Sequence, residues 1–118
     1  MRNFFVRLHH RTRWSWQGLV ATYRDEYSFR VWVWANLVSA TLAFWLPIGS
    51  SARTLILVLG LMVLVSELFN TAIERAVDHT STDHSKLAGQ AKDAASAAVA
   101  LTAVSAGIAW ALAIIQLI

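Results

Sequence analysis

The sequence of 118 residues contains no cysteine and few charged residues. Without cysteine, neither a disulfide framework nor a thiolate metal site can form. Charged residues make up 14% of the chain, whereas about 25% is usual in a soluble globular domain. Hydrophobic residues make up 57%, which excludes an ordinary soluble domain and indicates a small membrane protein. Because one short chain encloses little core, we expect several copies to associate.

Conventional phosphate-binding motifs are also missing. The sequence has no GxxxxGK[ST] phosphate loop and no HRD catalytic loop, which excludes a conventional nucleotide-binding fold. The formal charge of +3 could indicate a nucleic-acid partner, but the basic residues flank apolar segments and form no known reading motif. We therefore expect anionic lipid headgroups as the counterpart, and no nucleic acid.

Three apolar segments are long enough to cross a bilayer, which takes about 20 residues for about 30 Å of hydrocarbon. They cover approximately residues 29–48, 53–78 and 92–117. Before them, residues 5–25 interleave apolar side chains with arginines, a pattern typical of an amphipathic helix at the membrane surface. The prediction is a single all-α membrane domain over residues 1–118, with a surface helix and three transmembrane helices.

The basic residues predict the orientation of these spans. Six arginines lie at or before the start of the first span, and Lys86 and Lys92 lie between the second and the third. The positive-inside rule then places the N-terminus, and the loop between the last two spans, in the cytoplasm. The N-terminus lacks the continuous apolar stretch of a signal peptide, so we expect it to stay in the mature protein.

A polar stripe runs along the second predicted span and consists of Glu67, Asn70, Glu74 and Asp78. At about 100° per residue, these side chains fall on one narrow face of the helix. Glu67 lies roughly 16 Å along the helix from Asp78, where an ionised carboxylate costs about 2.5–3.5 kcal/mol on insertion scales. The stripe could hydrogen-bond a neighbouring helix, but clustered carboxylates at the membrane interface are also what Mg²⁺ requires. We interpret the stripe as a functional site.

Lys92, Asp93 and Ser96 share the cytoplasmic end of the third predicted span. Their spacings of three and four residues place a cation, a carboxylate and a hydroxyl at neighbouring positions of a helix. A lysine near a helix N-terminus can bind phosphate oxygens. The ordinary interpretation, however, is that the lysine side chain extends from the span to place its charge at the membrane interface.

Residues 67–78, ELFNTAIERAVD, resemble the signature of prokaryotic integral-membrane diacylglycerol kinases, E-x-x-N-[ST]-[SA]-[LIV]-E-x-x-V-D, at every constrained position. The resemblance continues through residues 87–99 and back to residues 15–19, so it covers nearly the whole chain. It implies a homotrimer in the bacterial inner membrane, with active sites that are shared between protomers and face the cytoplasm. It also implies transfer of the γ-phosphate of MgATP to the hydroxyl of 1,2-diacylglycerol, which gives phosphatidic acid.

The same resemblance implies roles for individual residues of the stripe and the third span. Glu67 would be the general base that takes the proton of the lipid hydroxyl, and Asn70 would orient it. Lys92 would neutralise the transferring phosphate. Glu26 and Glu74 would hold the divalent cations, with Mg²⁺ as the expected ion.

Further residues match family positions near the two substrates. Asp78 would support the cation and nucleotide end of the site. Contacts with ATP are implied, besides those above, for Arg7, Trp14, Asp83, His84, Ser85 and Asp93. Contacts with the lipid are implied, besides Glu67, for Arg7, Ser15, Trp16, Arg30 and Ser96. Trp14 stands where close relatives often have tyrosine, and Arg11 and Arg13 stand where they have small residues.

Three other functions are alternatives at this stage. A related Gram-positive branch of the family phosphorylates undecaprenol, although residues 96–98 look more like the diacylglycerol branch. A small multidrug transporter has a similar length and uses one membrane glutamate, but it needs four spans. In a non-enzymatic assembly protein, the polar stripe would only specify oligomerisation.

Overall fold

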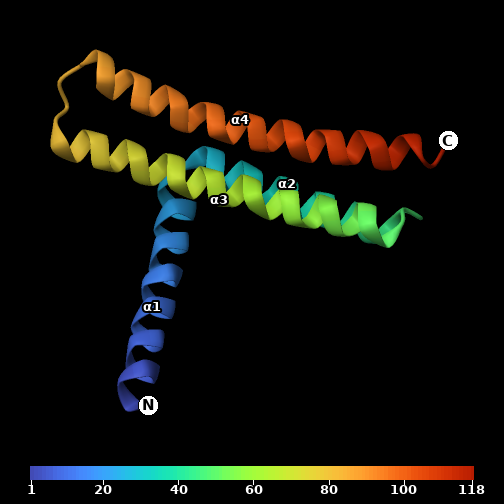
Figure 1. Cartoon of the computed structure of the whole chain (residues 1–118), viewed down its shortest axis with the longest axis horizontal. Coiled ribbons are helices and arrows are strands. Elements are labelled where there is room, and N and C mark those ends of the chain that lie inside the picture. Colours follow the sequence, from blue (N-terminus) through green and yellow to red (C-terminus); the bar gives the residue numbers. More distant parts are fainter.

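The computed structural model describes all residues, 1–118, and contains four α-helices and no strand. The helices are α1 (Arg2–Asp25), α2 (Tyr27–Trp45), α3 (Ser50–Thr80) and α4 (Lys86–Ile115). Helices α3 and α4 form an antiparallel hairpin, α2 lies beside α3, and α1 projects from the start of α2 away from the other three helices (Figure 1). The prediction of an all-α fold is confirmed.

The helix boundaries differ from the predicted segments where local signals end or begin a helix. Helix α2 stops at Trp45 because Pro47 follows, and a proline cannot continue the helical hydrogen bonding. Helix α4 starts at Lys86, well before the predicted start of the third span. It does so because the Ser85 hydroxyl accepts a hydrogen bond from the N–H of Ala88 and caps the helix.

Two of the four helices are long and apolar enough to cross a membrane. They are α3, with 31 residues and a mean hydropathy of 2.1, and α4, with 30 residues and a mean hydropathy of 2.2. Helix α2 has 19 residues, carries Arg30 and Asn36 among its apolar side chains, and is not one of these two helices. That α2 is a third transmembrane helix stays a proposal.

A small core lies at the end of the bundle where α2 turns into α3. Its buried residues are Ala43, Ile48, Ile56, Ala109 and Ala113. The three alanines among them let the helices approach closely. In the same bundle, the indole N–H of Trp110 on α4 donates a hydrogen bond to the Ser39 hydroxyl on α2 at 2.8 Å. This hydrogen bond links α4 to α2.

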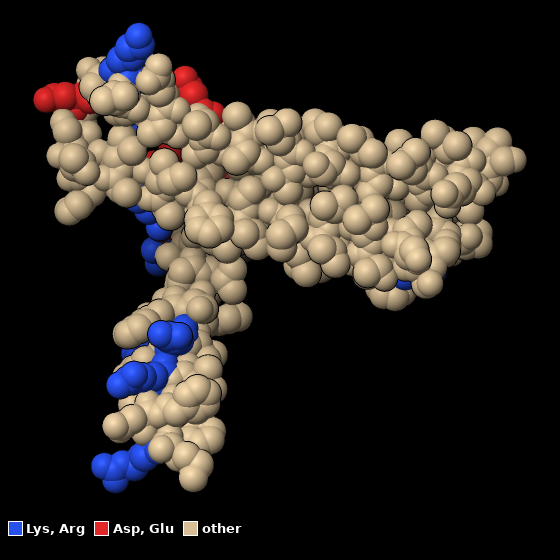
Figure 2. Space-filling model, in the orientation of Figure 1, with Lys and Arg blue, Asp and Glu red and all other residues tan.

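Charged side chains gather along α1 and at the loop between α3 and α4, as Figure 2 shows. The body of the bundle is uncharged on the face shown, apart from one basic group at its far end. Only 12 of the 118 residues are buried, so most apolar side chains of the bundle point outwards. The charged groups that could do chemistry therefore lie at one end of an apolar bundle.

Candidate active site

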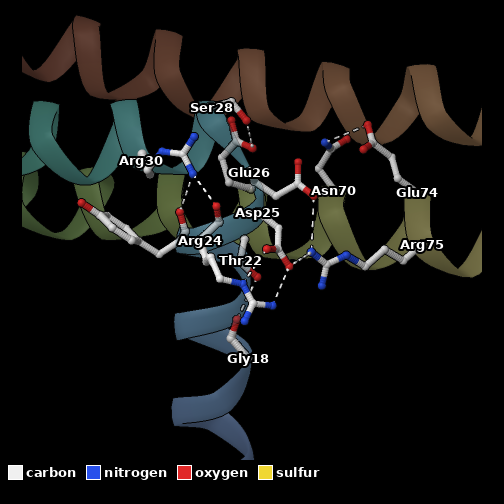
Figure 3. Close-up of polar contacts among 12 residues, drawn as sticks. Gly18, Thr22, Arg24, Asp25, Glu26, Ser28, Arg30, Asn70, Glu74 and Arg75 are labelled. Atoms are coloured by element: carbon white, nitrogen blue, oxygen red, sulfur yellow. Dashed lines mark hydrogen bonds and ion pairs between the residues drawn. The ribbon is translucent and has the colours of Figure 1, made fainter.

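Glu67 lies in the middle of α3 and is one of the few buried polar residues, with 4% of its surface exposed. It points toward the first turn of α2. There the hydroxyl of Ser28 donates a hydrogen bond to Glu67 Oε2 at 3.2 Å (Figure 3). The negative charges of Glu74 and Glu26 also act on this carboxylate. The innermost acid of the polar stripe is thus held by a neutral hydroxyl and lies near two other acids.

Asn70 and Glu74 form the next part of the stripe. The Asn70 amide donates a hydrogen bond from Nδ2 to Glu74 Oε1 at 3.2 Å. The amide oxygen of the same side chain, Asn70 Oδ1, is buried and has no hydrogen-bond partner. Because a buried acceptor without a donor is costly, this oxygen suits a donor from a ligand or from another chain. In this chain Asn70 pairs with Glu74 and makes no hydrogen bond to Glu67.

Glu26 is the single residue between α1 and α2, and its extended backbone turns the chain from one helix into the other. The Arg75 guanidinium of α3 lies 3.4 Å from Glu26 Oε1 and 3.7 Å from Asp25 Oδ2. Arg24 donates hydrogen bonds to both oxygens of Asp25, at 2.7 and 3.1 Å. These bonds hold the pKa of the Asp25 carboxyl below its usual range. Arg75 therefore links α3 to the junction of the surface helix with α2.

Arg30 stabilises the same junction from α2. Its Nη1 donates hydrogen bonds to the backbone carbonyls of Tyr23 and Arg24, at 2.9 and 2.6 Å, in the last turn of α1 (Figure 3). A cation at a helix C-terminus pairs with carbonyls that have no partner inside the helix. The guanidinium that the sequence suggested for lipid contact is thus engaged with the protein backbone.

A second cluster lies at the loop between α3 and α4. Lys92 Nζ is 2.6 Å from Asp78 Oδ1, so the ends of the two helices are joined by an ion pair. Beside this pair is a polar hollow of about 330 Å³, and its lining includes Asp83, His84 and Ser85. These five predicted residues surround one space of a size suited to a small polar ligand.

The remaining predicted residues lie outside both clusters. Four of them are exposed on α1, namely Arg7, Trp14, Ser15 and Trp16. Trp14 stacks on His10, with ring centroids 5.9 Å apart, rather than on another helix. Asp93 and Ser96 are exposed on α4. A single chain therefore brings Glu26 of the α1–α2 junction to α3 and gathers the residues of the loop, but it does not bring the four predicted residues of α1 to either cluster.

Two residues of the first cluster were not predicted from the sequence. Ser28 carries no sequence signal, because its hydrogen bond with Glu67 spans 39 positions and depends on how α2 packs on α3. Arg75 did carry a signal, since a cation next to Glu74 inside an apolar segment needs an acidic partner. The structure shows that its partners come from the α1–α2 junction.

The residues fit a magnesium ion only together with other ligands. No group of three or more histidine, aspartate or glutamate side chains lies close enough to hold a metal ion in this chain. Mg²⁺ is usually bound by one or two carboxylates, with phosphates and water as the other ligands. Glu26 at the α1–α2 junction and Glu74 on α3 can supply two such carboxylates, and Asn70, which hydrogen-bonds Glu74, carries an unpaired oxygen, Oδ1.

Comparisons with known proteins agree with the resemblance seen in residues 67–78. A model of the prokaryotic diacylglycerol kinase family matches residues 13–114, which include every predicted site residue except Arg7. The diacylglycerol kinase of Escherichia coli strain K12 is 35% identical over 106 residues, 90% of this chain and 87% of the relative. That of Pseudomonas aeruginosa PAO1 is 39% identical over 102 residues, 85% of this chain and 81% of the relative. That of Haemophilus influenzae Rd is 35% identical over 101 residues, 84% of each chain.

Proposed function

The chain belongs to the prokaryotic diacylglycerol kinase family and is a kinase, and we propose that it transfers the γ-phosphate of ATP to the hydroxyl of 1,2-diacylglycerol. The observation that carries this proposal is the buried carboxylate of Glu67, which already accepts a hydrogen bond from a hydroxyl. A base that removes the proton from a lipid alcohol must make the same kind of contact. The diacylglycerol kinases among its relatives favour diacylglycerol over undecaprenol as the acceptor.

Glu67 would act as the general base of the transfer. Its carboxylate takes the proton of the lipid hydroxyl while the hydroxyl oxygen attacks the γ-phosphorus of ATP. The bond between the γ-phosphorus and the β,γ-bridging oxygen then breaks, so that phosphatidic acid and ADP are formed. Phosphoryl transfer depends mainly on positioning and on neutralisation of charge, which fits a site built from hydrogen bonds and fixed charges.

The loop cluster would bind the nucleotide. Lys92 supplies a cation that can leave Asp78 and neutralise a phosphate oxygen, because their ion pair is partly exposed to solvent. Asp83, His84 and Ser85 line the hollow beside it and would contact ATP. The start of α4 adds backbone N–H groups that favour anions.

Glu26 and Glu74 would hold the Mg²⁺ that accompanies ATP. The ion held there would supply positive charge that offsets the charge developing on the phosphate oxygens. Arg75 keeps the Glu26 carboxylate next to α3, and Asn70 keeps that of Glu74 in place. The two acids would therefore be held in position before the nucleotide arrives.

A homotrimer in the inner membrane would complete the site. Arg7 and Trp14 lie on α1, outside both clusters of their own chain, and Asn70 Oδ1 lacks a donor. Both features support a site that a second chain shares. With α2, α3 and α4 as spans, α1 would lie at the cytoplasmic surface, where its arginines meet anionic headgroups.

A phosphoryl-transfer assay on purified protein tests this function. Wild type is given MgATP with diacylglycerol, with undecaprenol or with no lipid, and Glu67→Gln is compared with it. We expect transfer to diacylglycerol that falls by about 10²-fold or more in Glu67→Gln, the range typical of a lost general base. Asp25→Asn removes a carboxylate outside the proposed machinery and should keep transfer near the wild-type level. Full transfer by Glu67→Gln would rule out Glu67 as the base, and transfer to undecaprenol alone would reassign the substrate.

A further inference from the structure

Ser28 is the side chain of α2 that donates a hydrogen bond to the predicted base. It lies in the first turn of α2, and its hydroxyl reaches Glu67 Oε2 at 3.2 Å. Glu67 is 4% exposed, whereas Ser28 is exposed at the surface of the helix pair. The hydrogen bond therefore joins a buried carboxylate to a residue at the surface of the helix pair.

Other hydroxyl and amide groups near Glu67 are engaged elsewhere. Ser66, its neighbour in sequence, donates to the backbone carbonyl of Val63 at 2.7 Å. The Asn70 amide donates to Glu74. The Ser28 hydroxyl, 3.2 Å from Glu67 Oε2, is therefore the side-chain donor of α2 that hydrogen-bonds this carboxylate.

A carboxylate that rotates freely is a poor base, because its terminal torsion is broad and roughly two-fold. A donor on one oxygen restricts that rotation and leaves the second oxygen free to accept a proton. The charged groups that act on Glu67 are Glu74, on its own helix, and Glu26, at the start of α2. Both are anionic, so neither can replace the hydroxyl as a donor.

We propose that Ser28 is a positioning residue, whose hydroxyl holds one oxygen of Glu67 so that the other faces the acceptor hydroxyl of the lipid. The proposal rests on the proposed function of Glu67 as the general base. Loss of the hydroxyl should lower kcat about tenfold, as expected for one hydrogen bond to a charged group. The KM for the lipid should change little, because Ser28 acts on the base rather than on the substrate.

The experiment compares Ser28→Ala, Ser28→Thr and the matched control Ser66→Ala, each as full-length purified protein with MgATP and diacylglycerol. The proposal predicts a lower kcat with an unchanged KM for the lipid in Ser28→Ala, recovery of kcat in Ser28→Thr, and wild-type kinetics for Ser66→Ala. An unchanged kcat in Ser28→Ala would overturn it. So would a lower kcat that Ser28→Thr does not restore, together with a lowered melting temperature in both variants, which would assign Ser28 a structural role.

Glu67→Gln, measured in parallel, separates this inference from the proposed function. If Glu67→Gln keeps full transfer, the base assignment fails and the inference about Ser28 fails with it. If Glu67→Gln is inactive and Ser28→Ala behaves like wild type, only the inference about Ser28 fails.

Discussion

Lys92 and Asp78 form the shortest of the ion pairs in the chain, with their atoms 2.6 Å apart and their side chains 38% and 54% exposed. A pair this exposed contributes about 0–1 kcal/mol to stability, because water and salt screen it. Lys92 also lines the polar hollow, so we expect its main role to be ligand binding rather than stabilisation of the fold.

At Lys92, a substitution should change nucleotide binding far more than it changes stability. We expect Lys92→Met to raise the KM for ATP about tenfold or more, because the phosphates lose their neutralising cation. The melting temperature should change little, since the exposed ion pair is weak. Steady-state kinetics and thermal unfolding of the same preparation check both. A large drop in melting temperature with an unchanged KM would mean that Lys92 only joins the helices.

Helix α4 depends on its N-terminal cap at the loop. The Ser85 hydroxyl accepts the hydrogen bond from the Ala88 N–H and so satisfies one of the free donors at the helix start. Ser85→Ala should lower the free energy of unfolding by about 1 kcal/mol, the usual cost of a lost cap. Ser85→Asp should restore it, because aspartate caps a helix equally well. Thermal unfolding in detergent measures both, and an unchanged Ser85→Ala would show that the cap contributes nothing.

The junction of α1 with α2 is held by charges from two helices. Arg24 lowers the pKa of Asp25, and Arg75 reaches Asp25 and Glu26 from α3. A depressed folded pKa means that this stabilisation is present above the ordinary aspartate value and is lost as pH falls through the folded one. The hydrogen-exchange protection factors of the amides around Glu26 should therefore be unchanged from neutral pH down to about pH 5 and fall below about pH 4.

The matched substitutions for that experiment are Asp25→Asn and Arg75→Gln. Asp25→Asn removes the titrating group, so the fall in these protection factors at low pH should be reduced. Arg75→Gln should speed exchange at the junction at neutral pH while leaving α4 unchanged. If Asp25→Asn keeps the wild-type pH response, another carboxyl at the junction is responsible.

Much of each element could be predicted from the sequence, because helix periodicity and apolar length are local properties. Glu67, Asn70 and Glu74 lie on one face of α3 because of the helical periodicity alone, which can be calculated from their spacing. The hydrogen bond from Ser28 depends on how two helices pack, which no local pattern encodes. The early start of α4 at Lys86 was missed because the capping serine lies outside the apolar segment.

At the scale of the whole molecule, the bundle exposes far more apolar surface than a soluble monomer would. Along α4, Leu101, Val104, Ile108 and Leu112 are each more than half exposed. Exposed apolar surface of this extent marks contact with lipid or with other chains. The isolated position of α1 and the unpaired Asn70 Oδ1 agree with a site that is completed by another copy.

Mixing two impaired variants tests whether protomers share a site. Glu67→Gln lacks the proposed base and Arg7→Ala lacks an arginine of α1, and each is assayed alone for its background. If the base and the arginine of one site come from different chains, equal mixing in a trimer restores about a quarter of the sites. If both come from one chain, every chain carries one defect and the mixture stays at the background rate.

The most direct test of the account is a single turnover of γ-labelled ATP with diacylglycerol by wild type and by Glu67→Gln, after each has been shown to bind ATP and to keep its oligomeric state. A general base at Glu67 predicts that the variant binds the nucleotide normally but forms labelled phosphatidic acid at least about 10²-fold more slowly. Label transfer at the wild-type rate by a fully assembled Glu67→Gln protein would contradict it.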